Sequence, residues 1–319
     1  MTLFPLLSLP SLALEHVVKL LGPFELFDLS QCSRKSVALI RLASAKRYEL
    51  SLESHGVVVN DTQIFEAGIS GKSTKLLGKR KLFLANGKEI FVYVGCNRGD
   101  WNRRNFFFID RDFGLQIILF HLAELFGCRV DSINTGRYLS GEIQRFSSII
   151  GRVIEKQKVI RSLVIENRLN ESDLRWILDN LAITDYFKCD VSTSPNFEYE
   201  FKTFPRELSI HRSHWFKLDD LLAAAKSCVA ICLYKSYLEN KDIDVFMKAW
   251  ASGEFPTLRY LEVESRNLNE RDQILGRKPA QWWNDEEECG VKFRRDDGIE
   301  AVVEMNLYDI EDSFILNLL

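Results

Sequence analysis

The chain has 319 residues, of which 46% are hydrophobic and 12% aromatic, and its formal net charge is −3. This length is long for one domain and short for three, so two structural units with well-packed cores are expected. The slightly acidic balance argues against a nucleic-acid partner, because a protein that binds nucleic acid mainly through electrostatics carries a basic bias.

The first residues, MTLFPLLSLPSLALEHVVKLLG, are strongly apolar but fit neither a signal peptide nor a membrane span. No Lys or Arg precedes Lys19, and Pro5, Pro10 and Glu15 interrupt the apolar run, whereas a spanning helix needs about 20 apolar residues. No membrane partner is therefore expected. From Pro10 onward the spacing predicts an amphipathic helix with an apolar face of Leu14, Val17, Val18 and Leu21.

Two further short helices are expected before residue 46. Gly22-Pro23 ends the first helix, Phe24 and Leu26 belong to the second, and Ser33 is expected to cap the third. The three helices carry more apolar residues than a segment of about 40 residues can bury by itself. They are therefore expected to pack either on the rest of the chain or on another protein.

The order and spacing of this segment resemble the F-box motif, in the form common in a large nematode expansion of F-box proteins. The matching residues are Leu9-Pro10, Leu14, Val17, Leu21, Pro23-Phe24-Glu25-Leu26, Leu29 and Cys32-Ser33-Arg34. The resemblance covers about residues 4–45 and implies a helical adaptor-docking domain at residues 1–46. It implies that a Skp-type adaptor, and through it a cullin, is bound by Leu7, Leu9, Pro10, Leu14, Val17, Val18, Leu21, Phe24 and Leu26. Many F-boxes have a bulky aromatic residue where this chain has Ser36, a difference that is expected to weaken docking if that aromatic residue contacts the adaptor.

Residues 47–110 are expected to form a linker and a small antiparallel β unit. KLFLANGKEIFVYVG contains two apolar segments on either side of Asn86-Gly87, which is a strong signal for a β-hairpin. A third strand is expected around Phe106 to Phe108.

The second half of the chain contains an imperfect repeat of strand and helix. Residues 161–178, 230–250 and 258–275 each begin with a short apolar strand, and each then places a Leu four residues before an Asp. Asp173, Asp242 and Asp272 are therefore expected to cap helices rather than to catalyse a reaction. Alternating strands and helices predict a parallel sheet with helices outside, and the repeats favour an irregular, leucine-rich-repeat-like solenoid over residues 111–319.

The same segments, including WFKLDDLL and RRDDGIEAVVEM, are similar to the F-box-associated C-terminal domain of that nematode family. The similarity covers roughly residues 110–310 and follows the F-box-like helices in the expected order. Asp297-Gly298 is expected to form a final hairpin turn whose strands cap the end of the sheet. The predicted fold is thus α+β or α/β, with helices first, a small β unit next and the repeat domain last.

Several patterns suggest chemistry but fail on inspection, so no catalytic residue, cofactor or metal site is predicted. GISGKST lacks the first Gly of a phosphate-binding loop, because Glu66 stands at that position. His211 and His214 have no further Cys or His near them in the sequence, whereas a structural zinc site uses four ligands. No nucleophile elbow of the type G-x-S-x-G is present.

Two functions remain open. The family resemblance implies a non-catalytic substrate receptor of a Skp-cullin-F-box ubiquitin ligase, which binds an unidentified target protein through its C-terminal domain. The alternative is a protein-interaction scaffold with no ligase role, in which the first helices pack on the chain itself. The seven scattered cysteines favour free thiols in a reducing compartment, and so a cytoplasmic or nuclear protein.

Overall fold

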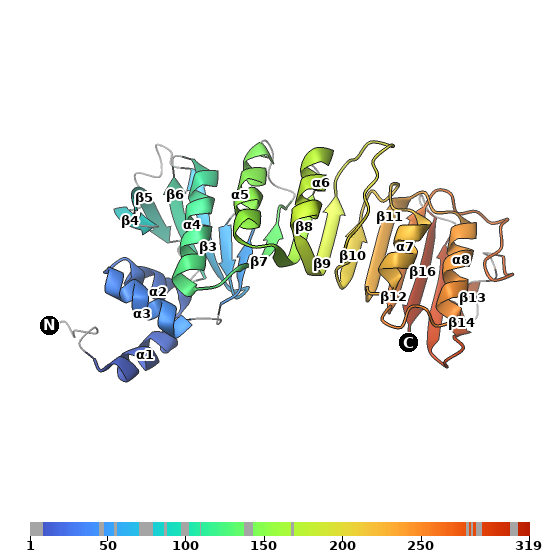
Figure 1. Ribbon diagram of the computed structural model, residues 1–319, viewed down its shortest axis with the longest axis horizontal. Helices are drawn as coiled ribbons and strands as arrows, with labels where there is room; N and C mark the ends of the chain where they lie inside the picture. The colour runs from blue at the N-terminus through green and yellow to red at the C-terminus, as the bar shows by residue number, and fades with distance from the viewer. Residues whose placement is uncertain are drawn as a thin grey trace. The chain divides into compact units, whose positions relative to one another are not determined.

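The computed structural model describes residues 9–44, 48–53, 56–69, 79–85, 88–96, 102–108, 110–136, 143–166, 169–278, 281, 283–284, 289–306 and 312–319. The chain divides into two compact units, Met1–Gln157 and Lys158–Leu319. Both units combine helices with a sheet, and the described residues contain eight helices (Figure 1). The mixed α/β class is therefore confirmed. The predicted domain limits at residues 46 and 110 stay predictions.

The N-terminal unit begins with three short helices, α1 (Ser11–Leu20), α2 (Pro23–Ser30) and α3 (Arg34–Ser44). Proline at the first position of α2 leaves no backbone N–H unsatisfied there. The Ser33 hydroxyl accepts a hydrogen bond from the Ser36 backbone N–H at 3.1 Å, so Ser33 caps α3 as predicted.

A mixed sheet follows these helices. Its strands are β1 (Leu50–Leu52), β2 (Gly56–Val59), β3 (Gln63–Ile69), β4 (Lys79–Ala85), β5 (Lys88–Cys96), β6 (Arg103–Phe108) and β7 (Val130–Asn134), in the order β7-β1-β2-β3-β6-β5-β4. The predicted hairpin is confirmed, because β4 and β5 pair antiparallel with Ala85 opposite Lys88. The sheet is not purely antiparallel, however. β3 pairs in parallel with β6, because the β4–β5 hairpin lies between them in the sequence. β1 pairs in parallel with β7, which follows α4 in the chain.

Helix α4 (Arg111–Phe126) forms the centre of the core of this unit, and α5 (Ile143–Lys156) follows β7. Leu115, Leu119 and Leu122 of α4 are buried, and the Phe126 ring lies 4.3 Å from that of Tyr48. The rings of Phe65 and Phe106, on the paired strands β3 and β6, are stacked 6.1 Å apart beneath the helical layer.

The C-terminal unit alternates strands and helices, as the repeats predict. Its elements are β8 (Val159–Glu166), α6 (Glu171–Asn180), β9 (Ala182–Asp190), β10 (Glu207–Ile210), α7 (Leu218–Ala225), β11 (Ala230–Ser236), α8 (Asn240–Ala251), β12 (Tyr260–Ser265), β13 (Trp283–Asn284), β14 (Cys289–Arg294), β15 (Glu300–Asn306) and β16 (Ser313–Leu318). Strands β8 to β12 are parallel neighbours in sequence order, and β16, β15 and β14 then continue the sheet antiparallel. β14 and β15 flank Asp297-Gly298, which confirms the predicted final hairpin.

One face of this sheet is fully apolar and is covered by helices (Figure 1). Ile231, Leu233, Leu261 and Val263 alternate along the central strands with relative exposures of 0%, and they pack against buried side chains of the helices. Those helix side chains are Leu174, Ile177, Leu221, Ile243, Phe246 and Trp250. The parallel strand–helix order is confirmed, whereas the leucine-rich-repeat-like solenoid stays a prediction.

The repeat differs from expectation at its aspartates and in its third copy. In α8, Asp242 lies at the third helical position, where its carboxylate accepts the backbone N–H of Glu239 at 2.9 Å. In α6 the capping residue is Asn170, whose side chain accepts the N–H of Asp173. After β12 no helix forms in the described residues up to 278, and turns take its place.

Candidate protein-binding site

The structure buries part of the predicted adaptor-docking face inside the N-terminal unit. Leu14, Val18, Phe24 and Leu26 are buried, Leu9, Val17 and Leu21 are half-buried, and Pro10 is exposed. Leu7 lies outside the described residues. The assignment of these nine residues to adaptor binding stays a prediction, but the four buried ones already have packing partners in the chain itself.

Contacts on the buried side of α2 explain why its apolar side chains pack inside the unit. The rings of Phe24 and Phe27 lie 4.8 and 5.4 Å from the ring of Phe65 on β3. The Arg104 guanidinium on β6 lies over the Phe24 ring at 4.8 Å and forms an ion pair with Asp28 at 2.8 Å. These aromatic and cationic contacts hold α2 on the sheet of its own unit, so this side of α2 is not a free surface.

A different set of apolar side chains on α1 and α3 faces solvent. Leu12, Leu20 and Leu42 have relative exposures of 68%, 86% and 80%. Leu12 and Leu20 lie eight residues apart on α1, which places them near the same side of the helix. Sequence reasoning missed them because it selected the apolar face around Leu14 and Val18, two side chains that the structure buries.

Ser36 lies at the position where many F-boxes have a bulky aromatic residue. Its relative exposure is 0%, and its hydroxyl lies 2.8 Å from that of Ser33. The packing around α3 therefore accommodates only a small side chain at position 36, because an aromatic ring there would displace its neighbours.

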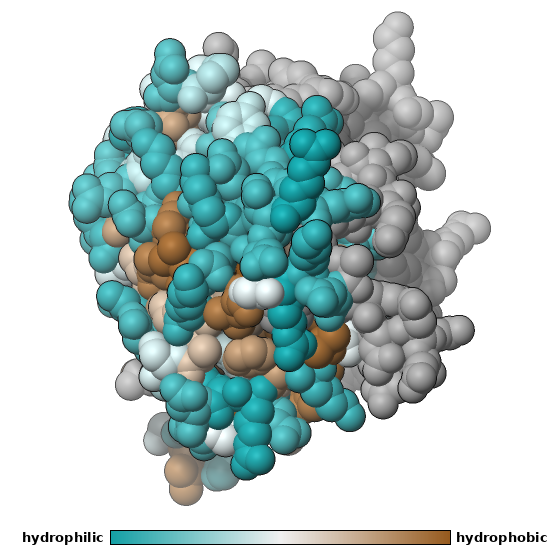
Figure 2. All heavy atoms as spheres, turned by 90° about the vertical axis from the view of Figure 1, so that its right-hand side faces the viewer, coloured by the Kyte–Doolittle hydropathy of each residue, from teal (hydrophilic) through white to brown (hydrophobic). Residues whose placement is uncertain are grey.

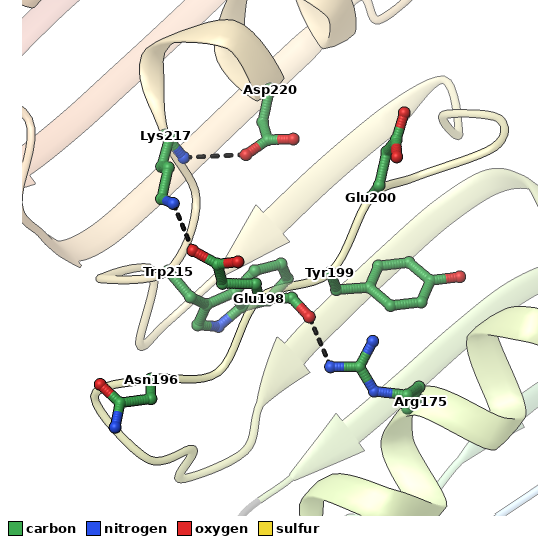
Figure 3. Close-up of a pocket in the computed structure, with 8 residues that line it drawn as sticks. All are labelled: Arg175, Asn196, Glu198, Tyr199, Glu200, Trp215, Lys217 and Asp220. Carbon is green, nitrogen blue, oxygen red and sulfur yellow. Dashed lines mark hydrogen bonds and ion pairs between the residues drawn. The ribbon is translucent and has the colours of Figure 1, made fainter.

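The C-terminal unit contains an open cleft of about 520 Å³ (Figure 3). Its lining residues come from α6, from the loop after β9 and from the start of α7, and they are Arg175, Asn196, Glu198, Tyr199, Glu200, Trp215, Lys217 and Asp220. Asp220 accepts the backbone N–H of Lys217 at 3.0 Å, which fixes the start of α7 beside the loop.

Two cations converge on Glu198 in this cleft. Arg175 donates to the backbone carbonyl of Glu198 at 2.5 Å, while the Lys217 ammonium forms an ion pair with the Glu198 carboxylate at 2.5 Å (Figure 3). The hydrogen bond from Lys217 lowers the pKa of Glu198, and the same bond raises the pKa of Lys217. Both groups therefore stay charged at neutral pH.

Aromatic rings support the same loop from below. The Arg175 guanidinium lies 5.1 Å from the centre of the Phe197 ring and 5.9 Å from that of Tyr199. The Phe197 ring meets buried Trp215 edge to face at 5.2 Å. Aromatic walls with charged groups around them are typical of a surface that recognises another protein.

The family comparison falls on this part of the chain. Residues 196–263 match the F-box associated family. The matched segment contains every lining residue of the cleft except Arg175. It confirms the predicted F-box-associated domain over these residues, whereas the F-box itself stays a prediction.

Two relatives from Caenorhabditis elegans align along most of the chain. The chain is 22% identical over 287 residues to Skn-1 dependent zygotic transcript 15 protein, and the alignment covers 83% of this chain and 81% of that protein. It is 23% identical over 307 residues to E3 ubiquitin-protein ligase hecw-1, where the alignment covers 85% of this chain but 24% of that much longer protein. No solved structure matches the chain.

The remaining motifs do not assemble into a site within the described residues. The His211 ring is tilted against that of Tyr234 with ring centres 4.7 Å apart, and His214 Nε2 lies 3.1 Å from the Ser194 carbonyl oxygen. The parts of the chain that the structure describes contain no cluster of three or more metal-ligating side chains. Most of GISGKST lies outside the described residues.

The side chains of five of the seven cysteines are described. Cys32, Cys128, Cys189, Cys228 and Cys232 are free thiols. Burial raises the pKa of both Cys189 and Cys228 to about 12, so these two thiols stay protonated. None of the described helices is both long and apolar enough to cross a membrane.

Proposed function

We propose that this chain is the substrate-recognition subunit of a Skp-cullin-F-box type ubiquitin ligase. The observation that carries the proposal is the F-box associated match at residues 196–263, which follows three short N-terminal helices in the order expected of an F-box protein. In this role the chain catalyses no covalent step and needs no cofactor. It contributes proximity, because holding a target beside the transfer enzymes raises the effective concentration of one for the other. Such a subunit acts in the cytoplasm, the nucleus or both.

The adaptor would meet the exposed side of the first helices. Leu12, Leu20 and Leu42 are accessible without any change in packing, and half-buried Leu9, Val17 and Leu21 extend the apolar area along α1. Burying such side chains at an interface contributes roughly 25 cal/mol for each Å² removed from water. Phe24 and Leu26 would support the docking helices from within the unit rather than contact the adaptor.

Co-purification with a Skp-type adaptor tests this function. Leu12→Asp with Leu20→Asp places two charges on the exposed side of α1, where both side chains are mostly accessible to solvent. Phe113→Asp with Val245→Asp is the matched control, because these side chains are also exposed on helices, with exposures of 54% and 44%.

We expect the wild type and the control to retain the adaptor and the α1 variant to lose it, with the same melting temperature for all three. An adaptor that fails to bind the wild type, or that binds the α1 variant equally well, contradicts the proposal.

One observation favours the alternative of a scaffold without a ligase role. Leu14, Val18, Phe24 and Leu26 are already buried by the chain, so the helices do not need a partner to cover them. A soluble wild-type protein that binds no adaptor would support this alternative.

A further inference from the structure

The face of the C-terminal sheet opposite the helices carries polar and aromatic side chains. Along β11 and β12 the buried residues Ile231, Leu233, Leu261 and Val263 alternate with the half-buried residues Cys232, Tyr234, Tyr260 and Glu262. Because neighbouring residues of a strand point to opposite faces, the second set lies on the side away from the helices. We call this second side the open face.

A tyrosine and glutamate cluster occupies the middle of the open face. The hydroxyls of Tyr234 and Tyr260 donate to the same Glu262 carboxylate oxygen at 3.0 and 3.1 Å. On the neighbouring strands Tyr186 stands opposite Glu207, and Cys232 stands opposite Glu262. The hydrogen bonds fix both tyrosine rings on the surface, which lowers the entropy cost of binding them to a partner.

Further carboxylates extend this cluster across the sheet. Glu304 on β15 stands opposite Ile315 on β16, and Ile315 stands opposite Glu262 on β12. Adjacent strands lie about 4.8 Å apart, so the Glu262 and Glu304 backbones are about 10 Å from each other. At this spacing the two carboxylates are far enough apart to pair with two different cationic side chains of one bound segment.

The charge of the central strands is mainly negative. Among the described residues of β10, β11, β12, β15 and β16, the open-face positions hold Glu207, Glu262, Glu264, Glu300 and Glu304, with Lys235 at the irregular end of β11 as their one cation. Two further cations lie on the edge strand β14, where Lys292 stands opposite Val302 and Arg294 opposite Glu300. At the β9 flank, Lys188 is paired with Glu166 at 3.3 Å. Burial and the Glu262 carboxylate raise the pKa of Cys232 to about 11, so this thiol adds no charge at neutral pH.

We propose that the open face, through Tyr186, Tyr234, Tyr260, Glu207, Glu262 and Glu304, binds a Lys- and Arg-rich segment of a protein. The carboxylates attract the cationic groups, and the tyrosine rings bind them by cation–π contact and cover their aliphatic stems. Nucleic acid and acidic peptides are repelled by the same charges. That this segment belongs to a ubiquitination target rests on the proposed function, whereas binding itself does not.

The cleft of Figure 3 is a weaker candidate for the same partner. Its Glu198 carboxylate is already paired with Lys217, and Arg175 donates to the Glu198 carbonyl, so cations of the chain itself occupy the position that a basic side chain would take. The side of the C-terminal unit that faces the viewer in Figure 2, which is the right-hand side of Figure 1, is mainly hydrophilic, with hydrophobic side chains in small groups.

Fluorescence anisotropy with the full chain tests the proposal. The probes are a labelled peptide of alternating Lys, Arg and Ser and a peptide of equal length in which Glu replaces Lys and Arg. The variant carries Glu207→Gln, Glu262→Gln and Glu304→Gln, which remove three charges while the new amide at 262 can still accept the tyrosine hydroxyls. The control carries Asp219→Asn, Glu254→Gln and Glu270→Gln, three exposed carboxylates of the same unit that lie on α7 and in loops, outside the cleft and the open face.

We expect the wild type and the control to bind the basic peptide alike and the acidic peptide not at all. Each exposed charge pair contributes about a three-fold change in affinity, so the open-face variant should bind about 30-fold more weakly. Added salt should weaken binding to the wild type more than binding to this variant.

Equal binding by the open-face variant and the wild type would overturn the proposal, as would equal loss in the control or binding of the acidic peptide. The adaptor experiment is independent of this one. Peptide binding without adaptor binding would support the open-face proposal and contradict the proposed receptor function. Adaptor binding without peptide binding would support the receptor function and contradict the open-face proposal.

Discussion

The buried imidazole of His121 should make the N-terminal unit less stable at mildly acidic pH. His121 lies on α4, with its ring 5.8 Å from that of Phe27 and a relative exposure of 6%. Burial lowers its pKa from 6.5 to about 4, and the opposing charge of Glu124 only partly offsets this shift. The folded state therefore holds His121 neutral at pH values at which the unfolded chain binds a proton.

The size and sign of the effect follow from proton linkage. Because the folded pKa lies below the unfolded one, the stabilisation is complete above pH 6.5 and is lost as the pH falls towards 4. Between pH 7 and pH 5 the free energy of unfolding should fall by about 2 kcal/mol from this group alone.

Urea unfolding of wild type and His121→Phe at both pH values measures the contribution, because the aromatic replacement cannot take up a proton. His16→Gln is the control, since this imidazole is exposed on α1. We expect a smaller pH dependence in His121→Phe by about 2 kcal/mol and no change in the control. Equal pH dependence in all three proteins, or an NMR titration of His121 near pH 6.5, would refute the reasoning.

Three substitutions test the packing described above by urea unfolding. The Asn240 side-chain amide donates two hydrogen bonds of 2.9 Å, to the backbone carbonyls of residues 269 and 272, and accepts one from the backbone N–H of residue 269. Asn240→Ala removes all three, so we expect the free energy of unfolding to fall by about 3 kcal/mol. An unchanged urea midpoint would contradict these contacts. Gly114→Ala places a Cβ atom 2.2 Å from the Phe108 ring and should cost about 2 kcal/mol, a cost that Phe108→Leu partly relieves if the clash is the cause. Ser36→Phe should lower the melting temperature rather than improve adaptor retention; retention gained at equal stability would show that the residue faces the adaptor.

The positions of most helices and strands could be predicted because the local patterns are strong. Gly22-Pro23 and the apolar spacing around Leu14 and Val18 define α1 and α2, and Asp297-Gly298 defines the last hairpin. In the third repeat the sequence predicts a helix because its Leu and Asp match the other two copies. The structure has turns there instead, and the buried Asn240 side chain of α8 holds them by hydrogen bonds. A contact of that kind comes from a residue almost thirty positions away and leaves no local signal.

The location of the candidate surfaces could not be predicted for a related reason. The alternation of Ile231, Cys232 and Leu233 shows that β11 has two faces, but it does not show that Glu262 lies beside Cys232. Register between parallel strands is set by the helix and loops that join them, and a shift of one residue would move every side chain to the other face. The tyrosine and glutamate cluster therefore emerges only when the strands are placed side by side.

On the N-terminal helices, apolar residues that stabilise the fold must be distinguished from apolar residues that bind a partner. A hydrophobic period on a helix shows that one side is buried, but a core and a partner produce the same period. Since Leu14 and Val18 lie in the core, a charge at either position would destabilise the fold and reduce adaptor binding for a reason unrelated to contact. Leu12 and Leu20 are free of that ambiguity, because their side chains are exposed and a charge there leaves the core intact. Loss of the adaptor from a variant at these two positions would therefore report the interface itself.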